Sequence, residues 1–230
     1  MTGVASFHLV RVRPLLAPAA LARLGTDRRR LSRTPGLAFW RLLGTGAASS
    51  TARGVDPART AMFAVWHDEA ALDAFMGRMA PRWASAAEAY HVRLRGLGGH
   101  GAWRGFDVLG AVDRGSATGP IAVLTRATVH LRHWRSFARA GRPVSEEVRA
   151  APGLLAVCGI GEAPVGRQGT FSLWRDAAAV RAFADEQPQH REVVQRTRAE
   201  GWYGEELFAR FEPFASSGSW DGREPLPSRR

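Results

Sequence analysis

The side chain in this sequence that most suggests chemistry is His190. A helix that opens near Pro188 would place its imidazole on an apolar stripe, because residues three and four apart share a helix face. The stripe holds His190, Val193, Val194, Thr197 and Gly201, and the opposite face holds Arg191, Gln195 and Arg198. A neutral, inward-facing imidazole can be an axial ligand of haem iron. From spacing alone, a histidine that packs in the core is the simpler interpretation.

Other histidines have the spacing of metal ligands but also have simpler explanations. His130 and His133 form an H-x-x-H pair, which would lie on neighbouring positions of a helix. No Glu, Asp or Cys nearby in the sequence completes a site, so we predict a solvated helix face. His67 precedes Asp68, and we expect Asp68 to be the N-cap of a helix that runs through Phe75.

A glycine-rich run and a single cysteine complete the candidates. Residues 96–101 match G-x-G-x-x-G, yet the following residues do not resemble the long helix of a dinucleotide-binding site. We predict a flexible loop there. Cys158, the only cysteine, excludes an internal disulfide framework and a cysteine-rich zinc site. It lies in an apolar run, where a free cysteine usually acts as a small hydrophobe.

The elements that position these residues are repeated along the chain. Phe63-Ala64-Val65-Trp66 and Phe171-Ser172-Leu173-Trp174 each lead into an alanine-rich segment that ends on a further phenylalanine. Three pairs of aromatic residues share an offset of 108 residues: Phe63 with Phe171, Trp66 with Trp174, and Phe75 with Phe183. Such self-similarity indicates a duplicated structural unit.

The order of elements in each half predicts the fold. Apolar runs at 6–12 and 121–129 open the halves, and runs at 39–46 and 155–161, each ending in Gly-x-Gly, precede the two copies. Strand, helix, strand, strand, helix, strand is the order of the ferredoxin-like unit, whose sheet has helices on one face only. Packing the two bare faces together buries both. We therefore predict an α+β protein of tandem ferredoxin-like repeats packed as a dimeric α+β barrel.

The boundaries of these units follow from composition. We expect a first repeat over residues 1–112 and a second, haem-binding repeat over residues 120–214, joined by a Gly/Ser/Asp-rich linker at 110–120. Residues 215–230 are rich in Ser, Gly, Pro and Arg, and we expect a flexible tail there.

The charge balance constrains the partners only weakly. The chain carries 32 Lys+Arg against 21 Asp+Glu, a net charge of +11, which could attract nucleic acid, anionic lipid or an acidic protein. The arginines are scattered and the aromatic residues occupy core-like positions, so we do not expect nucleic-acid binding. No apolar run approaches the length of a membrane span or signal peptide. We expect a cytoplasmic protein with only transient, peripheral membrane contact, and a homo-oligomer is an open alternative.

Longer stretches of the sequence resemble one family. They include Pro188-Gln189-His190, residues 170–174 and 200–211, residues 33–40, residues 124–128 and residues 159–164. In these stretches, which extend from about Val4 to Phe211, the chain resembles the spheroidene monooxygenases, which are acyclic carotenoid 2-ketolases.

The resemblance implies a haem enzyme that uses O2 and an external electron donor to oxidise a small lipophilic substrate such as an acyclic carotenoid. It implies heme b as cofactor and His190 as the axial ligand of the iron. We expect Phe171, Trp174, Val194, Thr197 and Trp202 to contact the cofactor, and Arg126, Thr128 and Arg198 to be the catalytic hydrogen-bond donors. Two alternatives stay open: a haem protein of this fold with peroxidase-like or dehydratase chemistry, and a non-catalytic barrel that binds a lipophilic ligand.

Overall fold

A computed structural model describes residues 3–46, 54–116, 118–163, 165–186 and 200–226 of the protein. In the first half the elements are β1 (Val4–Arg11), α1 (Ala17–Leu31), β2 (Leu37–Gly46), β3 (Val55–Trp66), α2 (Glu69–Ala84) and β4 (Glu88–Gly101). In the second half they are β5 (Ile121–Val129), α3 (Trp134–Ala150), β6 (Leu154–Gly161), β7 (Arg167–Trp174), α4 (Ala177–Glu186) and β8 (Tyr203–Gly218). The repeated order of strands and helices is as predicted.

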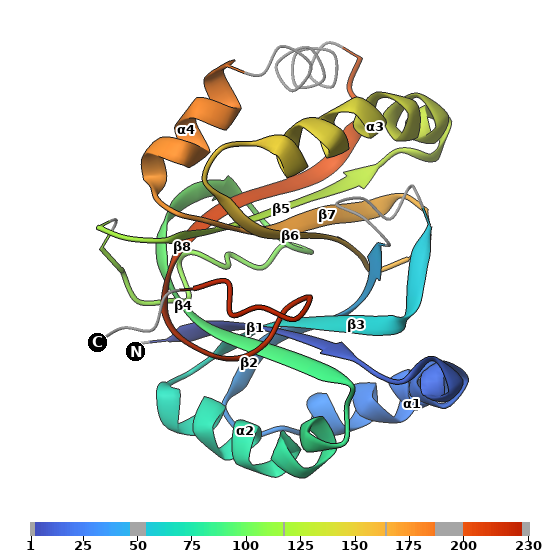
Figure 1. The fold of residues 1–230 in the computed structure, drawn as a ribbon, viewed down its shortest axis with the longest axis vertical. Helices are drawn as coiled ribbons and strands as arrows, with labels where there is room; N and C mark the ends of the chain where they lie inside the picture. Colours follow the sequence, from blue (N-terminus) through green and yellow to red (C-terminus); the bar gives the residue numbers. More distant parts are fainter. Residues whose placement is uncertain (1–2, 47–53, 117, 164, 187–199, 227–230) are drawn as a thin grey trace.

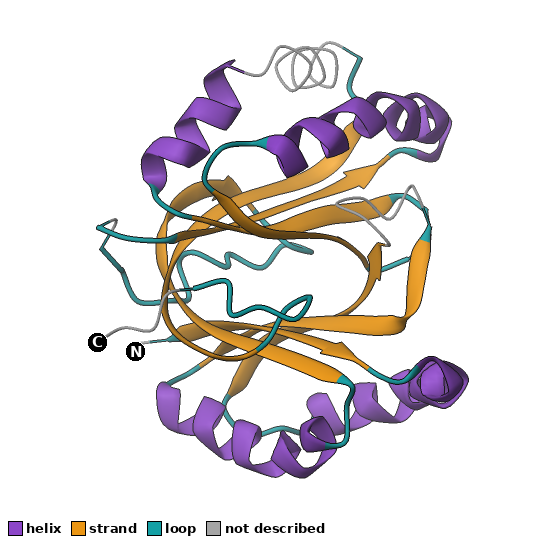
Figure 2. Cartoon of the chain, in the orientation of Figure 1, coloured by secondary structure: helices purple, strands orange, loops and turns teal. Residues whose placement is uncertain are grey.

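The strands form a closed barrel in the order β1-β3-β2-β6-β7-β5-β8-β4. Each half contributes four adjacent strands, and neighbouring strands are antiparallel. The halves meet along β4 and β8, which pair from Tyr90 with Gly218 to Gly101 with Leu207, and along β2 and β6, which pair at Gly44–Gly161 and Thr45–Ile160. Helices cover the outer face of each half (Figure 1, Figure 2). The predicted fold, tandem ferredoxin-like units closed into one α+β barrel, is confirmed.

Strand alternation divides the apolar side chains into an interior core and two outer layers. The interior is filled, and at its centre the rings of Phe7 and Phe171 stack with centroids 3.8 Å apart. The outer layers lie between sheet and helices. Each contains two aromatic rings of the sequence repeat in contact. The centroids of Trp66 and Phe75 lie 4.9 Å apart, and those of Trp174 and Phe183 lie 5.4 Å apart.

The glycine-rich run at 96–101 is a strand rather than the predicted flexible loop. It forms the end of β4 and pairs with β8. A side chain at Gly101 would place its Cβ 2.0 Å from the carbonyl oxygen of Glu206, and the φ angle of Gly101 is +87°. The glycines therefore allow two strands from different repeats to approach closely.

The segment after β4 closes one end of the barrel. Trp103 is completely buried and its ring lies 5.6 Å from that of Phe63, inside the interior core. Val108 and Val112 of the same segment are also buried. The connection between the halves is therefore packed against the interior before it reaches β5.

The residues after 214 differ from the flexible tail expected from composition. Strand β8 continues to Gly218, and the side chains of Trp220 and Leu226 are buried in the interior core. A segment rich in glycine and serine can be ordered when its backbone and side chains find hydrogen-bond partners, as they do here.

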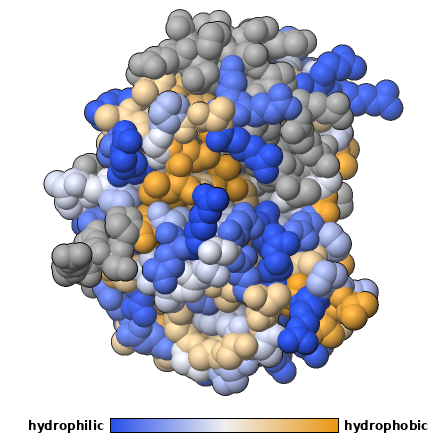
Figure 3. Space-filling model, in the orientation of Figure 1, coloured by the Kyte–Doolittle hydropathy of each residue, from blue (hydrophilic) through white to orange (hydrophobic). Residues whose placement is uncertain are grey.

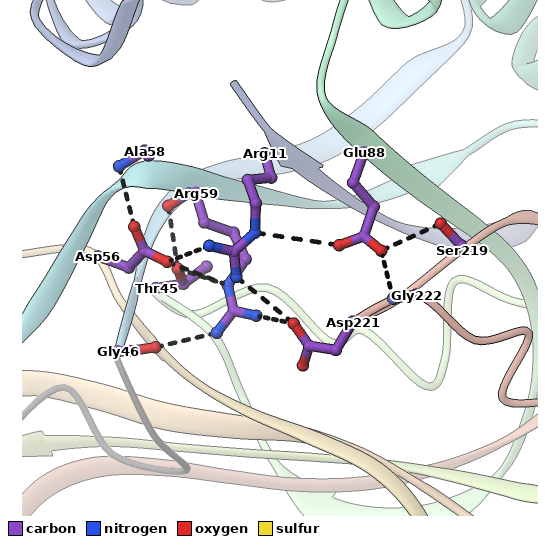
Figure 4. A network of polar contacts seen from close by, with 10 residues as sticks. All are labelled: Arg11, Thr45, Gly46, Asp56, Ala58, Arg59, Glu88, Ser219, Asp221 and Gly222. Carbon is purple, nitrogen blue, oxygen red and sulfur yellow. Dashed lines mark hydrogen bonds and ion pairs between the residues drawn. The ribbon is translucent and has the colours of Figure 1, made fainter. Parts of the chain in front are cut away.

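A polar network holds this C-terminal segment (Figure 4). Arg59 is 5% exposed, and its Nη1 lies 3.1 Å from Oδ1 of Asp221. Glu88 accepts hydrogen bonds from the hydroxyl of Ser219 at 3.0 Å and from the backbone N–H of Gly222 at 2.7 Å. These contacts join the end of the chain to β3 and to the start of β4.

Candidate functional site

Five charged side chains gather inside one end of the barrel, and we call them the barrel-mouth cluster: Arg41, Arg104, Arg126, Glu162 and Glu205. Arg41 Nε lies 3.0 Å from Oε1 of Glu162, and Arg126 Nη2 lies 3.7 Å from its Oε2. Arg126 also pairs with Glu205. Three guanidinium groups and two carboxylates leave the cluster with an excess of one positive charge.

The barrel-mouth cluster also fixes the segment that contains Trp103. The indole Nε1 donates to Oε1 of Glu162 at 2.9 Å. Glu205 accepts from the backbone N–H groups of Arg104 and Gly105 at 2.9 and 3.0 Å. Burial raises the pKa of Glu205, but these hydrogen bonds and the Arg126 guanidinium outweigh it, so the net pKa lies below the ordinary value. Glu205 is thus an ionised acceptor at neutral pH.

A second candidate surface lies on the opposite, helix-covered face of the second half. Thr125 and Thr170 are only half-buried in the middle of this sheet, and their hydroxyl groups lie 2.7 Å apart. Phe208 pairs with Thr125, and Arg210 pairs with Val123 in the same sheet. The Nε of Arg210 is buried and has no hydrogen-bond partner among the described residues. Small hydroxyl side chains and one unused donor therefore form the floor beneath the helices.

The first half carries two histidines at the equivalent place. His8 and His91, which pair across β1 and β4, lie 117 residues before Thr125 and Phe208. His8 and His91 are buried, and the ring of His91 lies 3.9 Å from that of Trp83. His8 and His91 also line a pocket beneath α2, whereas the second half has the smaller Thr125 beside Phe208 at these places.

The structure divides the predicted site residues between these two surfaces. Arg126 and Thr128 share one face of β5, because alternate strand residues point the same way, and this face is the barrel interior, which also contains Phe171. Trp174 lies in the outer layer beside α4, and Trp202 lies near α3, 6.5 Å from the ring of Phe137. Phe171 and Trp174 therefore lie on opposite faces of the sheet and do not line one pocket.

The remaining predicted residues cannot be placed. His190, Val194, Thr197 and Arg198 lie outside the described residues. Their predicted roles stay predictions.

The structure also places the other candidates of the sequence. Asp68 is the N-cap of α2, since its Oδ1 accepts from the backbone N–H of Ala71 at 2.8 Å. Cys158 is buried in β6, and burial raises the pKa of its thiol to about 12. Among the described residues no group of three or more His, Cys, Asp or Glu side chains could hold a metal ion. His130 and His133 accordingly have no such partners in the described part of the chain.

Sequence reasoning missed several contributors to these surfaces, among them Glu162, Glu205 and Arg210. Each of these three lies within a stretch that carries the family resemblance, 159–164 or 200–211. The alternation of side chains between the two faces of a strand was the available signal, because it places Glu205 on the interior face of β8 with the buried Leu207 and Ala209. Arg210, one residue further, points to the helices instead.

None of the described helices has the length and apolar character that crossing a bilayer requires. The architecture is a barrel of two fused ferredoxin-like units, with a charged cluster at its mouth and the hydroxyl groups of Thr125 and Thr170 on the helix-covered face of the second half. Two structures of aldoxime dehydratase share this fold. One has a TM-score of 0.62 at 11% identity and covers 94% of this chain and 81% of its own. The other, aldoxime dehydratase OxdRE in complex with butyraldoxime, has a TM-score of 0.63 at 10% identity, over 92% of this chain and 79% of its own.

Sequence similarity is more specific. The spheroidene monooxygenase of Rhodobacter capsulatus is 33% identical over 223 residues, which cover 92% of this chain and 90% of that protein. The spheroidene monooxygenase of Rubrivivax gelatinosus is 33% identical over 192 residues, or 82% of this chain and 73% of that protein. The spheroidene monooxygenase of Cereibacter sphaeroides is 33% identical over 200 residues, which cover 84% of this chain and 60% of that protein. No family model matches the chain. The chain belongs to the spheroidene monooxygenase family, and it is therefore an oxidoreductase of the monooxygenase class.

Proposed function

We propose that this protein is a haem-dependent monooxygenase that inserts oxygen from O2 into a lipophilic substrate such as an acyclic carotenoid. The observation that carries the proposal is the 33% identity to a spheroidene monooxygenase across 92% of the chain. The name of that relative supplies the substrate class. An external electron donor would provide the reducing equivalents.

The helix-covered face of the second half is the place that we propose for heme b. Its central side chains, Thr125 and Thr170, are small and half-buried, whereas the first half has the larger His8 at the place of Thr125. When bound, haem supplies the centre at which O2 is activated. The surrounding apolar side chains of the outer layer, which include Trp174, would exclude water from it.

His190 is the proposed axial ligand. The offset of 108 residues relates it to Arg82 in the first repeat. Arg82 forms a bidentate ion pair with Asp27 of α1, with nitrogen–oxygen distances of 2.8 and 2.9 Å. A side chain at this position of the repeat can thus reach the neighbouring helix. This supports an inward-facing imidazole at His190, with Val194 and Thr197 on the same predicted stripe.

Arg210 is the described residue best suited to bind a polar group on this face. Its buried Nε is a charged donor without a hydrogen-bond partner among the described residues. Such a donor favours a carboxylate, and heme b carries two propionates. We propose that Arg210 holds and orients the cofactor. Arg126 is engaged by Glu162 and Glu205 on the other face of the sheet, so its proposed catalytic role, and that of Thr128, requires substrate to enter the barrel mouth.

The first experiment is a haem titration monitored by the Soret absorption band. We expect stoichiometric binding by the wild type, loss or a shift of the band in His190→Ala, and no change in the control His67→Ala, because His67 is exposed. Absence of stoichiometric haem in the wild type would contradict the proposal and favour a ligand-binding barrel.

Two substitutions on one strand distinguish the two surfaces. Thr125→Phe adds a ring to the helix-covered face, and Thr128→Phe adds the same ring to the interior face. We expect only Thr125→Phe to weaken haem binding. If Thr128→Phe weakens it instead, the cofactor lies at the barrel mouth.

The reaction itself is tested with the haem-loaded protein, a chemical or protein reductant, an acyclic carotenoid and isotopically labelled O2. Mass spectrometry should detect the label in the product. Haem binding without incorporation of the label would favour the peroxidase-like or dehydratase alternative.

A further inference from the structure

Two turns on one side of the molecule expose leucine side chains, and we call them the leucine turns. The first (Pro14–Leu16) follows β1, and it leaves Leu15 95% exposed and Leu16 50% exposed. The second (Leu131–His133) follows β5, at the equivalent place in the second half, and leaves Leu131 76% exposed. Strands β1 and β5 both end on the right-hand side of Figure 1. The leucine turns therefore lie at the same end of the barrel.

The chain around the leucine turns is basic. Two stretches contain arginine but neither Asp nor Glu: residues 12–26 and residues 121–145. Arg13 and Arg132, which lie beside the exposed leucines, are themselves exposed. Asp27, the single acid of α1, pairs with Arg82 at 2.8 Å and is part-buried. The acid of the helix is thus neutralised by a partner within the protein.

The first turn continues into an apolar surface on α1. The buried residues of this helix are Ala17 and Leu31, and Leu21, one turn after Ala17, is 43% exposed. Figure 3 shows hydrophobic side chains at the lower right, where Figure 1 places α1, with hydrophilic side chains next to them. Exposed apolar side chains that gather in one place, as Leu15, Leu16 and Leu21 do, often mark an interaction surface.

We propose that the leucine turns dock the protein on the surface of an anionic lipid bilayer. Leucine side chains that project from a turn can enter the boundary between headgroups and acyl chains, and adjacent arginines can bind lipid phosphates. A second copy of this chain is a poorer occupant, because a two-fold interface would bring arginines of one copy against arginines of the other. Charge complementarity therefore favours the bilayer. This inference does not depend on haem or on the substrate.

The test is co-sedimentation of the whole chain with vesicles of phosphatidylcholine alone and of phosphatidylcholine mixed with phosphatidylglycerol. We expect binding to the anionic vesicles and little to the neutral ones. The double variant Leu15→Ser with Leu16→Ser keeps the charge and should lower the partition coefficient at least about tenfold. Leu131→Ser tests the second turn independently. Leu155→Ser is the matched control, since Leu155 is 38% exposed on β6, outside the leucine turns.

A charge variant separates the two contributions. Arg132→Gln with Arg135→Gln should weaken binding about tenfold at low ionic strength, and added salt should reduce the difference from wild type. Circular dichroism and size-exclusion chromatography establish that each variant is folded. Failure of the wild type to sediment with anionic vesicles would overturn the proposal, as would wild-type binding by the Leu15/Leu16 variant. A shift in oligomeric state caused by the leucine substitutions, without vesicle binding by the wild type, would assign the turns to an interface between copies.

Discussion

Acidification should destabilise the first half of the barrel through its buried histidine pair. His8 Nε2 lies 2.8 Å from the hydroxyl of Ser6, and His8 Nδ1 lies 3.0 Å from Nδ1 of His91. Trp66 Nε1 donates to the same Ser6 hydroxyl at 2.8 Å. The two facing Nδ1 atoms can share one hydrogen, so a second proton between them would break the hydrogen bond. The hydrogen bond between the rings is thus lost when both are protonated.

The expected pH dependence follows from the pKa values. Burial, with a contribution from His91, holds the pKa of His8 well below 6.5, and burial lowers that of His91 to about 4. Above pH 6.5 the histidines are neutral in both the folded and unfolded states and contribute no pH dependence. As the pH falls below 6.5 the unfolded chain takes up protons first, so the free energy of unfolding decreases until the folded histidines titrate. One proton corresponds to about 1.4 kcal/mol per pH unit, and the pair therefore to about 2.7 kcal/mol per pH unit at the steepest point.

The assay is urea unfolding followed by tryptophan fluorescence at about pH 7.5 and about pH 5. The informative variant is His8→Thr with His91→Phe, because Thr125 and Phe208 are the residues that the second half carries at these positions. We expect this variant to lose most of the decrease between the two pH values. His67→Ala, a change at an exposed histidine, should retain it. An equally steep decrease in the double variant would refute the reasoning.

Three further predictions concern single residues. Trp220→Ala removes a buried indole whose ring lies 6.3 Å from that of Phe171, and it should cost about 3–5 kcal/mol in urea unfolding; an unchanged midpoint would contradict the packing of the C-terminal segment. Cys158 should resist a thiol reagent in the native protein, since burial raises its pKa to about 12, and should react fully in denaturant; rapid native labelling would count against this. Asp68→Ala should cost about 1 kcal/mol of stability by removing the N-cap, whereas Asp68→Asn should retain most of it because an amide oxygen can also accept from the N–H of Ala71.

The fold could be predicted because its information is local and repeated. The aromatic residues at a constant offset, such as Trp66 and Trp174, establish the duplication, and the order of elements in each half follows from short runs of sequence. Pairing between the halves is different, since it joins residues more than a hundred positions apart. Nothing local marks Gly101 as a strand residue, because its need for a glycine comes from the backbone of Glu206.

The candidate site could be predicted only in part. Matched motifs drew attention to Phe171 and Trp174, three positions apart. Residues separated by an odd number of positions in a strand point to opposite faces, and the structure places one inside the barrel and the other under the helices. The importance of Thr125 arises from comparison with His8, a residue whose neighbours are known only once both sheets are in place.

The two seams of the barrel have unequal strength. Strands β4 and β8 pair along most of their length, whereas β2 and β6 meet at Gly44–Gly161 and Thr45–Ile160 among the described residues. If the barrel opens without unfolding, the short seam should separate first while the long one acts as a hinge. Native hydrogen exchange should therefore be faster at the β2–β6 amides than at those between β4 and β8. Separation of β2 from β6 would expose the interior face next to Glu162 and Arg41. It would thereby open a route by which an elongated molecule could reach the barrel mouth.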